Sequence, residues 1–141
     1  MAEYTVANIK QIEDQAPRLG QSPQLEARFA RSALELEQTG LSYQRLAPGF
    51  RMPFGHRHHQ QEEIYVVLSG SALAKLDDEL VELRAWDALR VPPQTTRSFE
   101  AGPDGVELLA FGAPSTGPVA ADVDVLPGWW GGDGGEPGGA G

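Results

Sequence analysis

Short alternating segments, broken at regular intervals by glycine, proline and acidic turn residues, dominate the middle of this chain. Between residues 34 and 112, roughly nine or ten such segments recur about every 8 to 12 residues, a spacing typical of β-sandwiches and β-barrels. The strands expected from this pattern are 34–37, 41–46, 51–58, 64–68, 71–76, 80–83, 87–91, 96–100 and 106–111. The pattern predicts an all-β domain over residues 34–112, with a hairpin between the first two strands.

The N-terminal extension, residues 1–33, has a different character. Ser22-Pro23 has the composition of a helix start, with serine as the N-cap and proline at the first helical position. Leu25 and Phe29 are four residues apart and would share one face of this helix. We therefore expect a short helix through Arg31 that packs over one end of the β-domain.

Composition changes again after the β-region. Residues 113–130 are rich in small residues and predict a C-terminal arm, which Trp129 and Trp130 would anchor to the body of the domain. From residue 131 to 141 nearly every residue is glycine, proline, alanine or acidic. Such a segment buries too little apolar surface to offset the entropy of ordering, so a disordered tail is expected.

Charge and cysteine usage exclude several classes of function. A net charge of −9 disfavours nucleic acid and anionic membrane surfaces as partners. The chain has no cysteine, so any metal site must use nitrogen and oxygen ligands. Met1 to Lys10 lacks the apolar core of a signal peptide, and no apolar run approaches the roughly 20 residues of a membrane span. A cytoplasmic protein is expected.

All three histidines of the protein lie within four residues, just before a strongly apolar segment. On an extended strand His56 and His58 point the same way, whereas His59 faces away. Glu63 opens the next strand and is expected near His58 across a tight hairpin. Two imidazoles and a carboxylate suit Fe, Mn, Zn or Ni, and the spacing alone does not choose among them. The competing interpretation is a solvated polar loop between two strands.

The stretch from Pro48 to Gly70 resembles the first motif of the cupin family, which is a glycine, H-x-H, a glutamate and a second glycine. The matching residues are Gly49, His56, His58, Glu63 and Gly70, and the six-residue gap to the last glycine selects Glu63 over Glu62. The segment from Trp86 to Ala101 resembles a degenerate second motif. The resemblance covers residues 34–112 and implies a double-stranded β-helix barrel, usually dimeric. It also implies a divalent metal held by two histidines, a glutamate and a third histidine.

The second motif departs from the family pattern where it matters most. Arg97 occupies the position of the third histidine, and further departures are Trp86, Gln94 and Ala101. Because His59 faces away and no histidine remains elsewhere in the chain, a metal would have three protein ligands at most, namely His56, His58 and Glu63.

Strand alternation predicts that Arg97 and Phe99 face the barrel interior. An arginine stays protonated and cannot bind a metal, which leaves two interpretations. In the first, a metal is bound and Arg97 meets the carboxylate or phosphate of a small anionic ligand; in the second, Arg97 pairs with Glu63 and no metal binds. Tyr65 and Phe99 are further candidates for ligand contact, although aromatic residues also fill barrel cores.

Two classes of function follow from these alternatives. The first is a metal-dependent enzyme of the cupin oxygenase or isomerase type that acts on a small carboxylate or enolisable molecule. The second is a small-ligand-binding module without turnover. A metal-free sugar-nucleotide isomerase is disfavoured, because the chain has no evident second catalytic acid. The outward apolar row Ile64, Val66 and Leu68 predicts a homodimer.

Overall fold

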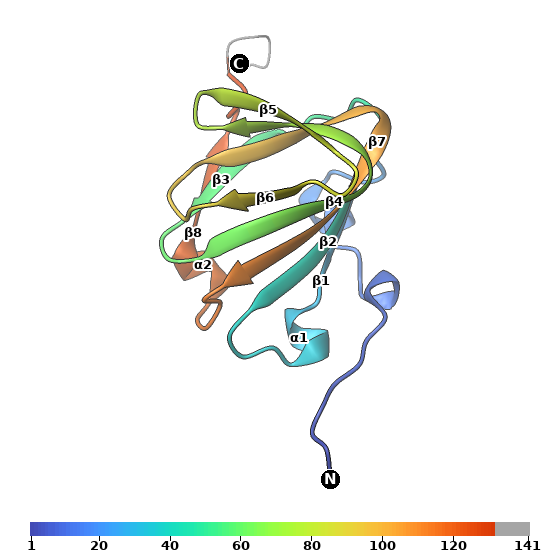
Figure 1. Ribbon diagram of the computed structural model, residues 1–141, viewed down its shortest axis with the longest axis vertical. Coiled ribbons are helices and arrows are strands. Elements are labelled where there is room, and N and C mark those ends of the chain that lie inside the picture. Colours follow the sequence, from blue (N-terminus) through green and yellow to red (C-terminus); the bar gives the residue numbers. More distant parts are fainter. Residues whose placement is uncertain (132–141) are drawn as a thin grey trace.

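The computed structural model describes residues 1–131, which form one curled antiparallel β-sheet with a few short helical turns (Figure 1). In chain order the elements are η1 (Ile9–Gln11), η2 (Ala16–Leu19), β1 (Leu25–Phe29), α1 (Arg31–Leu34), β2 (Gly40–Leu46), β3 (Phe54–His58), β4 (Glu62–Leu76), β5 (Glu79–Arg84), β6 (Ala88–Val91), β7 (Arg97–Ala113), α2 (Val119–Asp122) and β8 (Val123–Pro127). The tail expected to be disordered, residues 131–141, lies outside the described residues except for its first position. No helix within residues 1–131 has the length and apolarity needed to span a bilayer.

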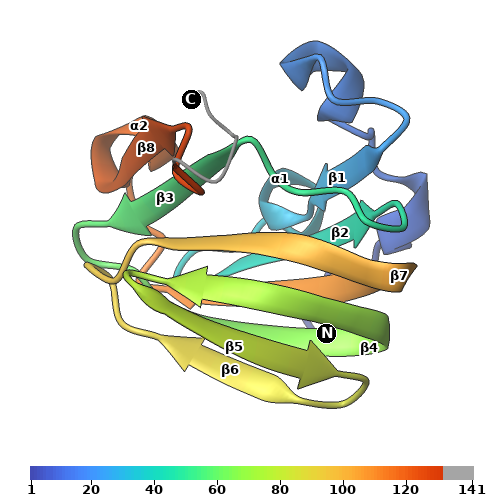
Figure 2. The same ribbon diagram turned by 90° about the horizontal axis from the view of Figure 1, so that it is seen from above.

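Two long strands, β4 and β7, form the frame of the barrel. They pair antiparallel along most of their length, from Glu62 with Ala113 to Leu76 with Arg97. β7 also pairs with β2 and β3, whereas β4 also pairs with β5 and β6. Because both strands bend and change partners, the sheet folds over itself into two facing layers (Figure 2). The predicted all-β barrel is confirmed, with the arrangement of a double-stranded β-helix.

The core fills the space between the two layers. Alternate residues of β4 point inward, so Tyr65 and Val67 are almost fully buried, whereas Ile64 between the inward positions is 43% exposed. β7 contributes Phe99 and Leu108 to the same cluster. The inward positions predicted for Arg97 and Phe99 and the outward position predicted for Ile64 are therefore confirmed.

The N-terminal helix expected through Arg31 is wrong, because Leu25–Phe29 forms the edge strand β1 beside β2. Leu25 and Ala27 are buried, and the residues between them face outward, which is the period of a strand. Phe29 is 51% exposed, so the helical spacing of Leu25 and Phe29 does not correspond to a shared buried face. Pairing with β2 along the whole segment, with the Ala27 backbone bonded to Asp14 and Gln15 on the other side, outweighs the local helix-start signal.

The strand expected at 34–37 is wrong as well. Leu34 ends the short helix α1, and Glu35 follows it with a left-handed φ of 56°. The segment 41–46 does form a strand, but its hairpin partner is β1.

Two predicted turns are bends within continuous strands. The segments 64–68 and 71–76 both belong to β4, and 96–100 and 106–111 both belong to β7. Register shifts in β4 flank Gly70, which has a φ of 74°. A Cβ atom at Gly70 would lie 2.0 Å from the carbonyl oxygen of Gly105, so glycine permits the close approach of the two strands. The turn residues therefore mark β-bulges that curl the sheet.

The C-terminal arm packs on the barrel as an additional strand. All five residues of β8 pair with the five residues of β3. A Cβ atom at Gly55 would lie 2.6 Å from Cγ of Trp129, so the Trp129 ring packs directly on β3. The Trp130 indole N–H donates to Oγ of Ser98 at 3.0 Å. The anchoring role predicted for both tryptophans is confirmed.

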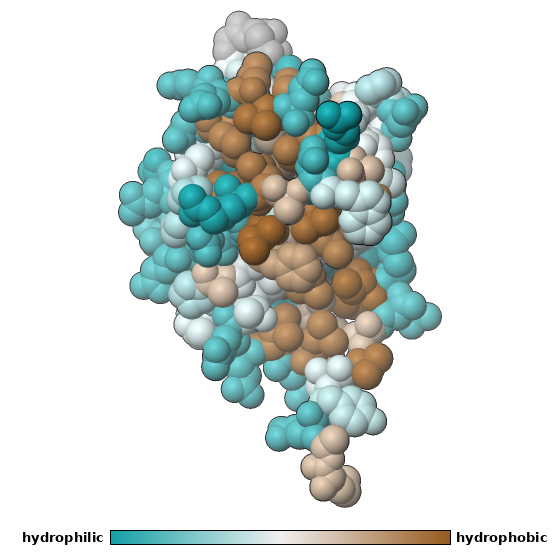
Figure 3. Space-filling view, in the orientation of Figure 1, coloured by the Kyte–Doolittle hydropathy of each residue, from teal (hydrophilic) through white to brown (hydrophobic). Residues whose placement is uncertain are grey.

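An apolar band covers part of the outer face of the sheet (Figure 3). Ile64 of β4 pairs in register with Phe111 of β7, which pairs with Leu41 of β2. Ile64 is 43% exposed and Phe111 41% exposed, and Val66 and Leu68 are half-buried. The homodimer predicted from this face stays a prediction.

Candidate metal centre

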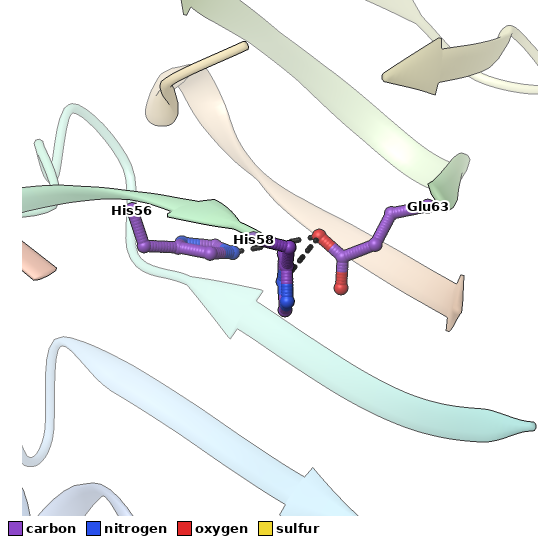
Figure 4. A group of neighbouring side chains, drawn as sticks. All are labelled: His56, His58 and Glu63. Atoms are coloured by element: carbon purple, nitrogen blue, oxygen red, sulfur yellow. Dashed lines mark hydrogen bonds and ion pairs between the residues drawn. The ribbon is translucent and has the colours of Figure 1, made fainter. Parts of the chain in front are cut away.

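Three side chains from β3 and β4 meet inside the barrel (Figure 4). His56 and His58 alternate on β3 and point the same way, with ring centroids 5.2 Å apart in an edge-to-face arrangement. Glu63, near the start of β4, directs one carboxylate oxygen at both rings. Its Oε1 atom lies 3.4 Å from Nε2 of His56 and 3.3 Å from Nε2 of His58. The histidines and the glutamate expected from the sequence do come together.

The route by which they meet differs from the expected hairpin. In the sheet β3 pairs with β7 and β8, whereas β4 pairs with β5, β6 and β7. Glu63 therefore reaches His58 across the barrel interior from the facing layer. This arrangement depends on closure of the barrel, because no ladder between β3 and β4 holds the two residues together.

The Glu63 carboxylate is the centre of the polar network. Besides the two histidines, its Oε1 atom accepts a hydrogen bond from the Tyr65 hydroxyl at 2.5 Å. Burial on its own raises the pKa of the Glu63 carboxyl, but the contacts with His56 and His58 outweigh burial and hold that pKa well below its usual range. Glu63 is therefore ionised and supplies a negative charge inside the barrel.

His58 is buried and has different partners on its two ring nitrogens. Nδ1 lies 2.8 Å from Oδ2 of Asp122, in the C-terminal arm. Nε2 faces Glu63 but makes no aligned hydrogen bond. Burial lowers the pKa of His58, yet the contacts with Glu63 and Asp122 outweigh it and raise that pKa above its ordinary value. Proton binding by His58 therefore competes with metal binding at Nε2.

The residues present fit a divalent metal. One donor atom from each of His56, His58 and Glu63 lies within 4.8 Å of the others. The buried Nε2 atom of His58 faces Glu63 without an aligned hydrogen bond, so its lone pair can serve as a metal ligand when the imidazole is neutral. Two imidazole nitrogens and a carboxylate oxygen form a donor set for Fe, Mn, Zn or Ni.

Arg97 lies next to this group and is completely buried. Its Nε atom is 3.6 Å from Oε1 of Glu63. Nη2 donates to the carbonyl of Pro92, and Nη1 donates to the carbonyls of Pro93 and His56. The ion pair of the second interpretation is thus present in the structure, and the guanidinium is enclosed by protein groups.

Tyr65 and Phe99 lie in the core beside the centre. Their ring centroids are 4.8 Å apart, and both side chains are buried. Ligand contact by Arg97, Tyr65 and Phe99 stays a prediction. His59 points outward, as expected, and its Nε2 atom lies 3.3 Å from Oδ1 of Asp124.

Asp122 is the one site residue that sequence reasoning missed. It is 64 residues from His58 in the chain, in a segment of small residues that the sequence marked only as an arm. An acidic residue in such a segment has no local signature of a role at the centre. Only the pairing of β8 with β3 brings Asp122 to the histidine.

Comparison with known sequences supports the fold. The sequence profile of the cupin domain family matches residues 42–111. A segment of 45 residues is 40% identical to an uncharacterized protein of Methanocaldococcus jannaschii, and it covers 32% of this chain and 36% of that protein. The match thus spans about a third of the length of this curated relative.

Solved structures extend the similarity to most of the chain. A cupin protein from Bacteroides fragilis is 28% identical, with a TM-score of 0.66 over 82% of this chain and 87% of the other. The polyketide cyclase RemF from Streptomyces resistomycificus is 18% identical, with a TM-score of 0.68 over 89% of this chain and 85% of the other, and shows the fold alone. Profile, motif residues and barrel agree: the chain belongs to the cupin superfamily.

Proposed function

We propose that this cupin binds a divalent metal through His56, His58 and Glu63 and presents it to a small anionic molecule. The observation that carries the proposal is the convergence of three donor atoms within 4.8 Å, with the buried Nε2 atom of His58 facing Glu63 without an aligned hydrogen bond.

Each residue has a distinct part in this centre. His56 and His58 provide neutral nitrogen ligands, and Glu63 provides the negative charge. The Tyr65 hydroxyl, which donates to Glu63 Oε1, orients the carboxylate. A bound Fe, Mn, Zn or Ni ion supplies Lewis-acid or oxygen-activating chemistry, with coordination positions left open to an external molecule.

The charges around the centre favour an anionic ligand. Arg97 offsets the charge of Glu63, and Asp122 behind His58 contributes one further negative charge, so a divalent ion bound here leaves one net positive charge in the group. Uncompensated charge in a buried site is costly. A carboxylate or phosphate at the open positions would remove this cost, which supports the small-anion class of ligand.

The second candidate is a metal-free, non-enzymatic cupin that binds a small ligand. The observation in its favour is the complete burial of Arg97 at 3.6 Å from Glu63, since a cation near the carboxylate opposes metal binding. In this case Arg97 supplies the positive charge that pairs with Glu63 in place of a metal ion, and the barrel binds a small ligand without catalysing a reaction.

Metal content separates the two candidates. The protein would be purified by a non-histidine tag, without a nickel column, and its metals measured by inductively coupled plasma mass spectrometry. We expect a near-stoichiometric divalent metal that is lost in His56→Ala. His59→Ala, which removes the exposed histidine paired with Asp124, is the matched control and should retain it. If the wild-type protein is isolated without metal and takes up none on dialysis against divalent Fe, Mn, Zn or Ni, the metal proposal is refuted and the metal-free candidate remains.

A further inference from the structure

We infer that Asp122, carried by the C-terminal arm, is a positioning residue for the metal centre: it fixes the ring of His58 so that Nε2 faces Glu63. The consequence for metal binding rests on the function proposed above. The orientation of the His58 ring by Asp122 does not depend on that function.

The hydrogen bonds of Asp122 support this role. Its Oδ2 atom lies 2.8 Å from Nδ1 of His58, and its Oδ1 atom accepts from the backbone N–H of Gln60 at 2.8 Å. Its carbonyl oxygen accepts from the N–H of His59 at 2.8 Å. An ionised carboxylate only accepts hydrogen bonds, so Nδ1 must carry the proton of this contact. When the imidazole is neutral, the lone pair is then on Nε2, the atom directed into the barrel.

The place of Asp122 is set by elements other than His58. The β3–β8 ladder begins directly after it, with Val123 opposite His58. At the far end of the arm Lys75 Nζ donates to the carbonyl of Trp129 at 2.8 Å, and Trp130 is bonded to Ser98. These contacts of the arm therefore fix the position of the Asp122 carboxylate independently of its contact with His58.

A purely structural role is the competing explanation, in which Asp122 only caps the turn after β3 through Gln60. Asp122→Asn distinguishes the two, because an amide has one accepting oxygen. If that oxygen keeps the hydrogen bond from the Gln60 N–H, the NH₂ group faces Nδ1 of His58. Because NH₂ is a donor, Nδ1 must then accept, which favours the tautomer whose proton is on Nε2. The turn cap then survives while the ligand atom is blocked.

The affinity of metal-free protein for Zn²⁺, measured by isothermal titration calorimetry, is the first readout. Replacement of a group that orients a histidine ligand weakens metal binding by about 10- to 100-fold, and we expect this for Asp122→Asn. Asp124→Asn is the matched control, since it removes the same charge from the start of β8, where Asp124 pairs with the exposed side chains of Arg57 and His59. It should change the affinity by less than about two-fold.

The Nδ1–H signal of His58 in ¹⁵N-resolved NMR spectra of metal-free protein is the second readout. We expect a protected Nδ1 proton in the wild type and in Asp124→Asn, and its loss in Asp122→Asn and Asp122→Ala. The amide signals of β8 report whether the arm stays attached in each variant. A variant with β8 in place, wild-type Zn²⁺ affinity and an unchanged Nδ1–H signal overturns the inference. If the wild type binds no Zn²⁺, the proposed function fails, and the Nδ1–H signal alone decides the positioning of His58.

Discussion

Replacing Arg97 by methionine tests how the interior of this barrel balances its charges. Methionine keeps much of the side-chain volume but removes the guanidinium. Glu63, whose side chain is 12% exposed, then loses the cation at 3.6 Å from its Oε1 atom. The carbonyls of Pro92, Pro93 and His56 lose their donors at the same time.

The size of the effect follows from these contacts. Removal of one partner from a buried ion pair costs about 3–5 kcal/mol, because the remaining charge is stranded. His56 and His58 stay close to Glu63 and compensate part of the loss, so we expect about 4 kcal/mol. This is a large share of the roughly 5–15 kcal/mol that stabilises a domain, and it corresponds to a fall in Tm of about 8–16 °C.

Urea unfolding of the metal-free protein at constant pH, with a chelator present, measures the change. The matched control is Arg90→Met, which removes the ion pair of Arg90 with Glu62, whose side chains are 65% and 53% exposed. The control should cost less than about 1 kcal/mol. Adding Glu63→Gln to Arg97→Met should restore part of the stability, because the stranded charge is then gone. A cost below about 1 kcal/mol for Arg97→Met, or no recovery in the double variant, would refute this reasoning.

Three further predictions concern metal affinity, acid stability and assembly. Arg97→His replaces the interior cation by a fourth ligand, so the Kd for Zn²⁺, measured by titration calorimetry, should fall by at least about ten-fold; an unchanged Kd would show that position 97 does not face the ion. The folded-state pKa of Glu63 lies below its unfolded value of about 4.3, so the stability that Glu63 contributes is complete above that value and is lost progressively as pH falls from it towards the folded-state pKa. Urea midpoints between pH 7 and pH 3 should therefore drop more steeply for the wild type than for Glu63→Gln, and parallel curves would contradict the assignment. Phe111→Lys places a charge beside Ile64 on the outer apolar face and should convert a dimer to a monomer in light scattering, whereas Val125→Lys, at an exposed position of β8, should not; a wild-type monomer would exclude the dimer.

Alternation along single strands accounts for the parts of the site that the sequence predicted. The side-chain period of two places His56 and His58 on one face of β3, and Glu63 with Tyr65 on one face of β4. This period is a property of each strand by itself, so it holds whichever strands become neighbours.

Local signals failed where a tertiary contact opposed them. The helix-start pattern at Ser22-Pro23 is outweighed by the backbone pairing of Leu25–Phe29 with β2. The turn signals near Gly70 became a bulge, because β4 continues along β7 on both sides of it. In each case hydrogen bonds to a distant strand exceed the preference of a short segment.

The sequence alone determined the class of fold, the inward faces of β3 and of the first part of β4, and the identity of three metal-ligand candidates, since all of these follow from residue type and a two-residue period. The folded barrel determined which of these residues meet: Glu63 faces the histidines across the interior, Arg97 is enclosed beside it, and Asp122 reaches His58 from 64 residues away. The first of these contacts requires closure of the barrel, whereas the β3–β7 and β3–β8 ladders place Arg97 and Asp122; both arise from pairing between distant segments that no local pattern relates.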